Sequence, residues 1–119
     1  MKKILVIEDN ADNLYMITFL LEKNGYMVIV AEDGVEGVKL SVSEKPDLIL
    51  MDIQIPLLDG YEAAKQIKAN KKISNIPIIA ITSFAMIGDK EKAMNAGCDG
   101  YIEKPINPET FIAELERFL

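Results

Sequence analysis

The acidic residues that end two apolar runs are the side chains of this sequence best suited to chemistry. Glu8 and Asp9 directly follow the run at residues 4–7, and Asp52 follows the run at residues 48–51. Carboxylates within a few ångströms of one another repel unless a positive charge compensates them. A divalent cation is the simplest compensation, and a partly hydrated site built from oxygen atoms suits Mg²⁺ best. Taken alone, Glu8 and Asp9 could equally be an ordinary acidic strand end that favours the N-terminus of the next helix.

Two further polar side chains end later apolar runs. Thr82 follows residues 78–81, and Lys104 follows residues 100–103. A threonine hydroxyl donates a hydrogen bond, and a lysine is a compact cation on a long side chain. Beside a metal they would hold a phosphoryl group, with Lys104 neutralising charge, Thr82 fixing one oxygen and Asp52 acting as the nucleophile. Alone, the two would be a surface lysine and a β-branched strand end, so the prediction requires all these residues to meet.

The spacing of the apolar runs predicts the elements that would bring them together. Five runs with strand character begin at residues 4, 27, 48, 78 and 100, which leaves gaps of 23, 21, 30 and 22 residues. Each gap fits one helix and two short loops, and a polar loop at residues 70–75 explains the longest gap. Strands and helices that alternate in this way predict a parallel sheet covered on both faces. Right-handed crossovers favour the strand order 2-1-3-4-5.

That strand order predicts where the acidic residues lie. The first and third strands are neighbours at the switch point, and open parallel sheets bind their ligands there, at the carboxyl edge. Glu8 and Asp9 should therefore face Asp52 across one crevice. The predicted fold class is α/β, a doubly wound five-stranded parallel sheet of the flavodoxin-like (βα)5 type.

Apolar periodicity and turn signals predict the helices. Asn10 is a suitable N-cap for the first helix, and Asp33 and Asp59 open the second and third. Asn107 and Pro108 are expected to start the last helix, which would end with the chain. Apolar residues at helical spacing form three predicted faces: Leu14, Ile17 and Leu21; Val35, Val38 and Val42; and Ile112, Leu115 and Leu119.

Composition excludes several functions. The 119 residues suffice for one domain with its own core. The net charge of -6 gives no electrostatic footprint for nucleic acid, so direct binding to it is not expected. The absence of histidine excludes Ser-His and Cys-His catalysis, and any phosphohistidine must lie on another protein. No apolar run approaches the roughly 20 residues that cross a bilayer, so membrane insertion is not expected, and the single cysteine, Cys98, favours the reducing cytoplasm.

Over essentially all 119 residues, the chain resembles the receiver domains of two-component response regulators. The resemblance is carried by the segments 4–9, 47–52, 78–83 and 97–101, together with Pro56, Asp59-Gly60 and Lys104-Pro105. The segment 82–89 is most similar to single-domain receivers of the cell-cycle type and to receivers attached to hybrid kinases. The resemblance implies one receiver domain over residues 1–119, with no output domain.

The resemblance also implies a phosphoacceptor and its metal. Asp52 would accept a phosphoryl group from a phosphohistidine on a histidine kinase or a histidine phosphotransfer protein. Mg²⁺ would be held by Asp9, Asp52 and the backbone carbonyl of Gln54, with Glu8 acting through water. Such a domain is a signalling switch and not an enzyme, beyond catalysing its own phosphorylation and dephosphorylation.

A conformational switch is implied as well. Thr82 and Lys104 would contact the phosphoryl group, and Tyr101 would turn inward as Thr82 moves. The peptide bond between Lys104 and Pro105 would be cis, which an X-Pro bond allows at small cost. Phosphorylation would shift an equilibrium between two states and alter the face formed by the fourth helix, fifth strand and fifth helix, where a downstream protein would bind.

Two positions near the phosphoryl group bear on its lifetime. Ser83 stands where the family usually has Ala or Gly, and a hydroxyl there would narrow access or add a hydrogen bond. The family ties the lifetime of the acyl phosphate to the positions of Gln54 and Phe84. The bulk of Phe84 predicts slower hydrolysis than in fast chemotaxis-type receivers.

Two alternatives compete with the phosphorylation switch. An aspartate-nucleophile phosphohydrolase would need a second acid two residues after Asp52, where this chain has Gln54. A receiver that binds partners without phosphorylation would not need the intact set of acidic, threonine and lysine residues. Both alternatives therefore fit the sequence less well.

Overall fold

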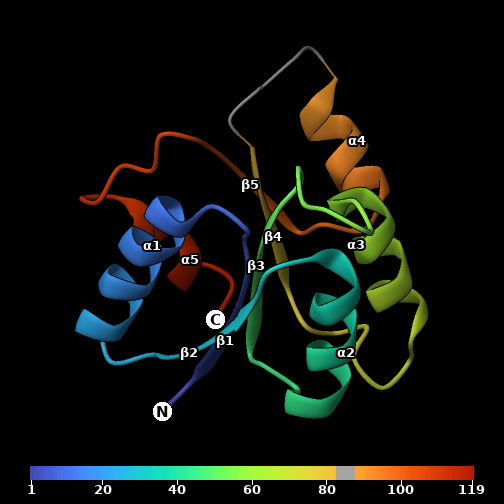
Figure 1. Cartoon of the computed structure of the whole chain (residues 1–119), viewed down its shortest axis with the longest axis horizontal. Helices are drawn as coiled ribbons and strands as arrows, with labels where there is room; N and C mark the ends of the chain where they lie inside the picture. The colour runs from blue at the N-terminus through green and yellow to red at the C-terminus, as the bar shows by residue number, and fades with distance from the viewer. Residues whose placement is uncertain (83–87) are drawn as a thin grey trace.

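The strands form one parallel sheet, and the helices cover both of its faces (Figure 1). The structure, a computed structural model, describes residues 1–82 and 88–119, so the predictions for Ser83 and Phe84 fall outside the described residues. The elements are β1 (Lys3–Ile7), α1 (Ala11–Lys23), β2 (Met27–Ala31), α2 (Gly34–Glu44), β3 (Leu48–Asp52), α3 (Gly60–Ala69), β4 (Ile78–Thr82), α4 (Asp89–Asn95), β5 (Gly100–Glu103) and α5 (Phe111–Glu116). No helix within the described residues has the length and apolar character that crossing a membrane requires.

The sheet has the strand order β2-β1-β3-β4-β5, which confirms the predicted doubly wound topology. All four pairs of neighbouring strands are parallel, and β1 pairs with β3 in a register that sets Ile7 beside Met51. Every residue of β3 and β4 is buried, because helices cover the central strands on both faces. The carboxyl ends of these strands consequently lie together at one edge.

Two apolar layers hold the helices against the sheet. Side chains of one strand alternate between its faces, so Leu5 and Ile7 of β1 join the layer beneath α2, α3 and α4. Ile4 and Val6 join the opposite layer, with buried residues of α1 and α5. Figure 1 shows this division, with α1 and α5 on one side of the sheet and α2, α3 and α4 on the other.

Three helices begin at the N-caps that the sequence predicts. The side chains of Asn10, Asp33 and Asp59 each accept a hydrogen bond from the main-chain amide three residues later, at 3.0, 2.7 and 3.0 Å. These bonds satisfy amides that the first helical turn leaves without partners. The caps therefore fix where α1, α2 and α3 leave the carboxyl edge of the sheet.

The predicted apolar face of α2 is right for Val38, which packs against the core, and wrong for the other two valines. Val35 and Val42 are 41% and 40% exposed, whereas Gly34, Gly37 and Ser41 are buried. The helix lies so close to its neighbours that a Cβ on Gly37 would come within 2.5 Å of the Ile7 side chain. Small residues therefore occupy the closely packed positions of the helix, and Val35 and Val42 turn outward.

The predicted bounds of the last helix are also wrong. The helix α5 runs from Phe111 to Glu116 and does not start at Asn107 or continue to Leu119. The Asn107 side chain accepts a hydrogen bond from the amide of Glu109 at 3.0 Å, and its carbonyl accepts one from the amide of Phe111 at 2.9 Å. These bonds close a separate turn, so the N-cap signal at Asn107 opens that turn and the regular helix begins later.

Candidate functional site

Four strands deliver polar side chains to one place at the carboxyl edge. Asp52 and Thr82 are the last residues of β3 and β4, Glu8 directly follows β1, and Lys104 directly follows β5. Glu8, Asp52 and Thr82 are buried, at 1%, 6% and 4% exposure. Buried polar side chains at the ends of adjacent parallel strands form the crevice that this fold uses for ligands.

Lys104 joins two of the acids directly. Its Nζ lies 2.8 Å from Oε1 of Glu8 and 2.8 Å from Oδ2 of Asp52. The Lys104 side chain is only 10% exposed, so it is not the surface lysine that its sequence position alone would suggest. The main-chain amide of Lys104 also donates to the carbonyl of Thr82 at 2.8 Å, and this bond holds the backbone of Lys104 beside the end of β4.

Main-chain amides bind the remaining oxygens of the same two carboxylates. Oε2 of Glu8 accepts from the amides of Asp9 and Asn10, at 3.1 and 3.3 Å. Oδ1 of Asp52 accepts from the amide of Gln54 at 2.8 Å. Charged acceptors form strong hydrogen bonds, so Glu8 and Asp52 are held in fixed orientations. Sequence reasoning did not identify these amides, because every residue carries one.

Burial and close charges shift two pKa values in this group. Burial, followed by the nearby Asp52 side chain, raises the pKa of Glu8 despite the opposing effect of Lys104. Burial alone would lower the pKa of Lys104, but hydrogen bonds to Asp52 and Glu8 outweigh it and raise that pKa. The lysine therefore remains a cation between the two acids.

Three acids are close enough to share a metal ion. Glu8, Asp9 and Asp52 each offer a carboxylate oxygen, and these oxygens lie within 4.8 Å of one another. Asp9 is exposed, whereas the other two are buried, so the group reaches solvent on one side. Oxygen donors with access to water fit Mg²⁺ better than a metal that prefers nitrogen or sulfur ligands.

The loop after β3 is packed against the site. A Cβ on Gly60 would lie 2.7 Å from the Cα of Ile53 and 3.1 Å from the carbonyl oxygen of Asp52. The amide of Gly60 donates to the carbonyl of Ile53 at 3.0 Å, which turns the chain directly into α3. Glycine at this position therefore allows the close turn that holds Asp52 at the mouth of the crevice.

A cavity of about 370 Å³ opens beside Thr82 and Gln54. Tyr61 of α3 and Lys92 of α4 form part of its wall, and the Lys92 Nζ lies 4.4 Å from the centre of the Tyr61 ring. This cation–π contact connects the two helices next to the site. Sequence reasoning missed Tyr61 and Lys92, because no spacing rule pairs residues from separate helices.

Tyr101 is the second residue of β5, three residues before Lys104, and it packs against the apolar layer beneath α2, α3 and α4. The residue is half-buried, and partial burial followed by the charge of Asp89 raises its pKa. In the sheet, Tyr101 pairs with Ala80, two residues before Thr82 on β4.

The peptide bond between Lys104 and Pro105 is cis, which agrees with the position implied by the resemblance.

The comparisons with known proteins agree on one family. The family model of the response regulator receiver domain matches residues 4–116. The polar-differentiation response regulator DivK of Brucella anthropi is 41% identical over 118 residues, which cover 99% of this chain and 96% of DivK.

Two solved structures extend this similarity. The receiver domain of a sensor histidine kinase from Pseudomonas aeruginosa PAO1, with a magnesium ion coordinated in its active-site cleft, is 37% identical with a TM-score of 0.91. That alignment covers 98% of this chain and 96% of the other. A chain in the co-crystal structure of the Saccharomyces cerevisiae histidine phosphotransfer protein Ypd1 with the receiver domain of Ssk1 is 31% identical. It has a TM-score of 0.90, and the alignment covers 98% of this chain and 88% of that one.

Proposed function

Because this chain belongs to the response regulator receiver domain family, we propose that Asp52 is its phosphoacceptor and that Glu8, Asp9, Thr82 and Lys104 assist the transfer. As a receiver domain of two-component signalling, the chain is a signalling module and not an enzyme that turns over a substrate. Receiver domains work with histidine kinases and histidine phosphotransfer proteins. This chain contains no histidine, so its phosphoryl donor is another protein.

The contact of Lys104 with both acids carries the proposal. Its Nζ lies 2.8 Å from an oxygen of Glu8 and 2.8 Å from an oxygen of Asp52, and the side chains of Lys104 and Asp52 are only 10% and 7% exposed. A cation held against a buried carboxylate is also positioned to compensate the charge of a phosphoryl group that forms on it. No other ion pair between described residues brings acids from two strands onto one lysine.

The acids fit a divalent cation. When ionised, Glu8, Asp9 and Asp52 carry three negative charges against the single positive charge of Lys104. An incoming phosphoryl group adds more negative charge, and Mg²⁺ supplies the compensating positive charge when bound. We propose that Asp9, Asp52 and the backbone carbonyl of Gln54 hold the ion, with Glu8 acting through water.

The transfer step follows from these positions. A carboxylate oxygen of Asp52 attacks the phosphorus of a phosphohistidine on the partner, so a P–O bond forms as the P–N bond breaks. The electron pair of the broken bond returns to the imidazole nitrogen, which takes a proton from solvent. Lys104 then contacts an oxygen of the phosphoryl group, and the hydroxyl of Thr82 donates to another. Transfer between positioned groups depends mainly on such orientation and charge compensation.

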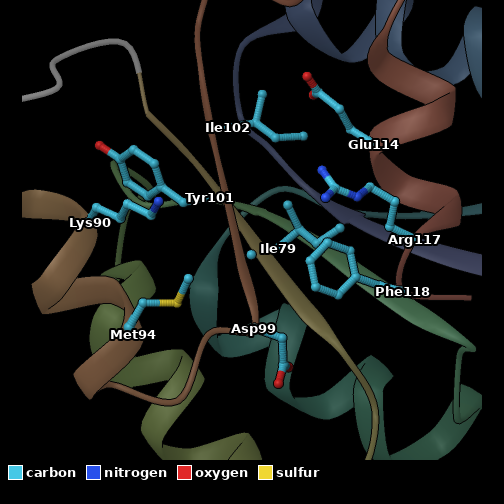
Figure 2. Close-up of a pocket in the computed structure, with 10 residues that line it drawn as sticks. Ile79, Lys90, Met94, Asp99, Tyr101, Ile102, Glu114, Arg117 and Phe118 are labelled. Carbon is cyan, nitrogen blue, oxygen red and sulfur yellow. The ribbon is translucent and has the colours of Figure 1, made fainter.

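We propose that the response appears on the face formed by α4, β5 and α5. A cavity of about 450 Å³ lies on this face, and Figure 2 shows Lys90 of α4, Tyr101 of β5 and Phe118, just after α5, around it. Movement of Thr82 toward the phosphoryl group would leave space for Tyr101 to turn inward. Because Tyr101 lines the cavity, this turn would change the surface that a downstream protein meets.

We also propose that residues 1–119 act as one receiver domain located in the cytoplasm. The two apolar layers share one sheet, which supports a single folding unit. Cys98 is a free, buried cysteine, which is the usual condition of a cysteine in a reducing compartment. Fractionation of cells that express the protein would test its location.

Incubation with Mg²⁺ and acetyl phosphate, followed by intact mass measurement, tests the proposed phosphoacceptor. We expect one phosphoryl adduct on the unaltered protein, and none on Asp52→Asn or in the presence of EDTA. Asp47→Asn is a matched control, because Asp47 belongs to the same segment but is exposed and accepts from the amide of Lys3. An adduct that persists in Asp52→Asn, or that is lost in Asp47→Asn alone, would contradict the assignment.

A further inference from the structure

A groove lies between α3 and α4, next to the proposed phosphorylation site. Its volume is about 350 Å³, and its wall includes Tyr61 and Lys65 of α3 and Glu91, Lys92 and Asn95 of α4. Figure 1 shows these two helices beside each other. The volume is near the lower limit of ligand pockets, about 300 Å³, so the groove accommodates a few side chains of a partner and not a whole helix.

We propose that this groove binds a short acidic segment of a partner protein. The segment would be extended chain, in which aspartate or glutamate residues flank an apolar side chain. Lys65 and Lys92 would bind the carboxylates, and the half-buried ring of Tyr61 would contact the apolar side chain. Clusters of basic side chains recognise acidic motifs in this way.

The two lysines are arranged around Tyr61. The Nζ of Lys92 lies 4.4 Å from the centre of the Tyr61 ring, and this contact restrains the lysine side chain. Lys65 follows Tyr61 by four residues, which places both on the same face of α3. Both lysines are exposed, so a carboxylate can reach them. A side chain that is already restrained loses less conformational entropy on binding, which favours affinity.

The local charge favours an acidic partner, although the chain as a whole is acidic. Residues 60–95, from the start of α3 to the end of α4, contain six lysines and three acidic residues, a net charge of +3. The remainder of the chain therefore carries -9, since the total is -6. Among the described residues, neither Lys65 nor Lys92 takes part in an ion pair, and Glu91 is the only acid in the groove wall. Carboxylates of a partner would supply the counter-charge that these lysines lack.

The shape and charge of the groove also separate this partner from two other occupants. A nucleic acid would extend beyond a groove of this volume and meet the -9 charge on the rest of the chain. A second copy would have to present acids from a different surface, so the contact would not be symmetric and would build rings or filaments. A short acidic segment has neither restriction.

The groove adjoins the proposed phosphorylation site without including its acids. Tyr61 and Lys92 line both the groove and the cavity beside Thr82, whereas Lys65 lines only the groove. The three acids that could share a metal ion line neither cavity. Binding of the acidic segment should therefore not require phosphorylation, and substitution of Lys65 should leave the phosphorylation reaction unchanged.

Short peptides test the proposal on the full chain. The probe is a peptide of about eight residues, about 26 Å long when extended, with glutamates on both sides of a central leucine. One control peptide has glutamine in place of every glutamate, and another has lysine. NMR chemical-shift titration gives the Kd and locates the site, and each titration is carried out at low and at high salt.

We expect the acidic peptide to shift amides of α3 and α4, with weaker binding at high salt because exposed charges are screened. The glutamine and lysine peptides should bind far more weakly. Lys65→Glu should weaken binding of the acidic peptide about fivefold or more and strengthen binding of the lysine peptide. Lys39→Glu is the matched control, because Lys39 is exposed on α2 and lies outside the groove. Neither variant should alter adduct formation with acetyl phosphate, so the test does not depend on the proposed phosphoacceptor.

Several results would overturn the proposal. These are equal binding of the glutamine peptide, shifts confined to other faces, or equal effects of Lys65→Glu and Lys39→Glu. Concentration-dependent self-association that Lys65→Glu abolishes would assign the groove to a second copy. Binding of a single-stranded oligonucleotide, but not of the acidic peptide, that depends on Lys65 would assign it to nucleic acid. Circular dichroism of each variant distinguishes lost binding from lost folding.

Discussion

Replacement of Lys104 by methionine should reveal how much the acid pair depends on its cation. Lys104 places one Nζ 2.8 Å from both Glu8 and Asp52, and its side chain is 10% exposed. Methionine keeps much of the volume and removes the charge. The variant would therefore leave two buried carboxylates facing each other without a compensating charge.

The size of the effect follows from this geometry. Removal of one partner from a buried ion pair typically costs about 3–5 kcal/mol of unfolding free energy. Main-chain amides still bind Glu8 and Asp52 in the variant, so we expect a loss near the lower limit, about 3 kcal/mol. With a urea m-value of about 2 kcal/mol/M, the unfolding midpoint should fall by about 1.5 M. The variant should also form no phosphoryl adduct with acetyl phosphate.

Urea unfolding in EDTA measures this loss without a contribution from bound metal. Lys3→Met is the matched control, because Lys3 pairs with Glu44 at 3.8 Å and both side chains are partly exposed. A surface pair contributes about 0–1 kcal/mol, so the control should shift the midpoint little. Asp52→Asn should reduce the cost of Lys104→Met by about 1 kcal/mol or more, since it removes one of the facing charges. Equal losses for Lys104→Met and Lys3→Met would refute the reasoning.

Three other substitutions or titrations probe features away from this pair. Gly34→Ala should lower stability by more than about 2 kcal/mol in urea unfolding, because an added Cβ would collide with the carbonyl oxygen of Leu58; an unchanged midpoint would contradict this. Burial, followed by the nearby Asp99, raises the pKa of the Cys98 thiol to about 11, so Ellman's reagent at about pH 8 should react slowly with the folded protein and quickly in urea. The hydrogen bond from Tyr26 to Glu116, 2.7 Å long, raises the tyrosine pKa to about 12. Its small stabilising effect should be present below pH 10 and lost as the pH rises toward 12; ultraviolet titration of Glu116→Gln should show that pKa moving back toward 10.

The strands were predictable because their signal is local. The strand Gly100–Glu103 agrees with the sequence prediction residue for residue, Met27–Ala31 begins at the predicted residue, and the other three strands differ by one residue at one end. Short apolar runs between turn residues have few other ways to bury both faces. Right-handed crossovers then leave the observed strand order as the common arrangement.

Which residues of each helix face the core was less predictable, because this depends on how closely the helix packs against its neighbours. In α2, Gly37 lies against Ile7 of the sheet and Gly34 lies against Leu58 of the loop after β3, and both approaches are too close for a valine side chain at those positions. An apolar periodicity cannot distinguish a face that packs closely from one that only covers a neighbour. The start of α5 depends on a similar competition, because Asn107 can cap a turn or a helix and the burial of Phe111 favours the later start.

The candidate site was also predictable only in part: the sheet topology could be predicted from the sequence, but the contacts of its long side chains could not. Parallel strands force Asp52 and Thr82 to one edge, so the sequence sufficed to bring them together. The reach of Lys104 was not predictable in detail, because a long flexible side chain can take several partners. In this structure Lys104 binds Glu8 and Asp52, so it would have to change partners in order to contact a phosphoryl group.

Lys104 has two proposed roles that require different positions. Between Glu8 and Asp52 it compensates acids that would otherwise repel each other, and beside a phosphoryl group it must contact a new set of oxygens. If the lysine moves without replacement, the three acidic side chains are left with carboxylate oxygens within 4.8 Å of one another. A divalent cation among those oxygens would supply the charge that frees Lys104 for the phosphoryl group. Under the proposed function, the acid cluster and the lysine therefore act as one unit, in which metal binding would favour phosphorylation of Asp52.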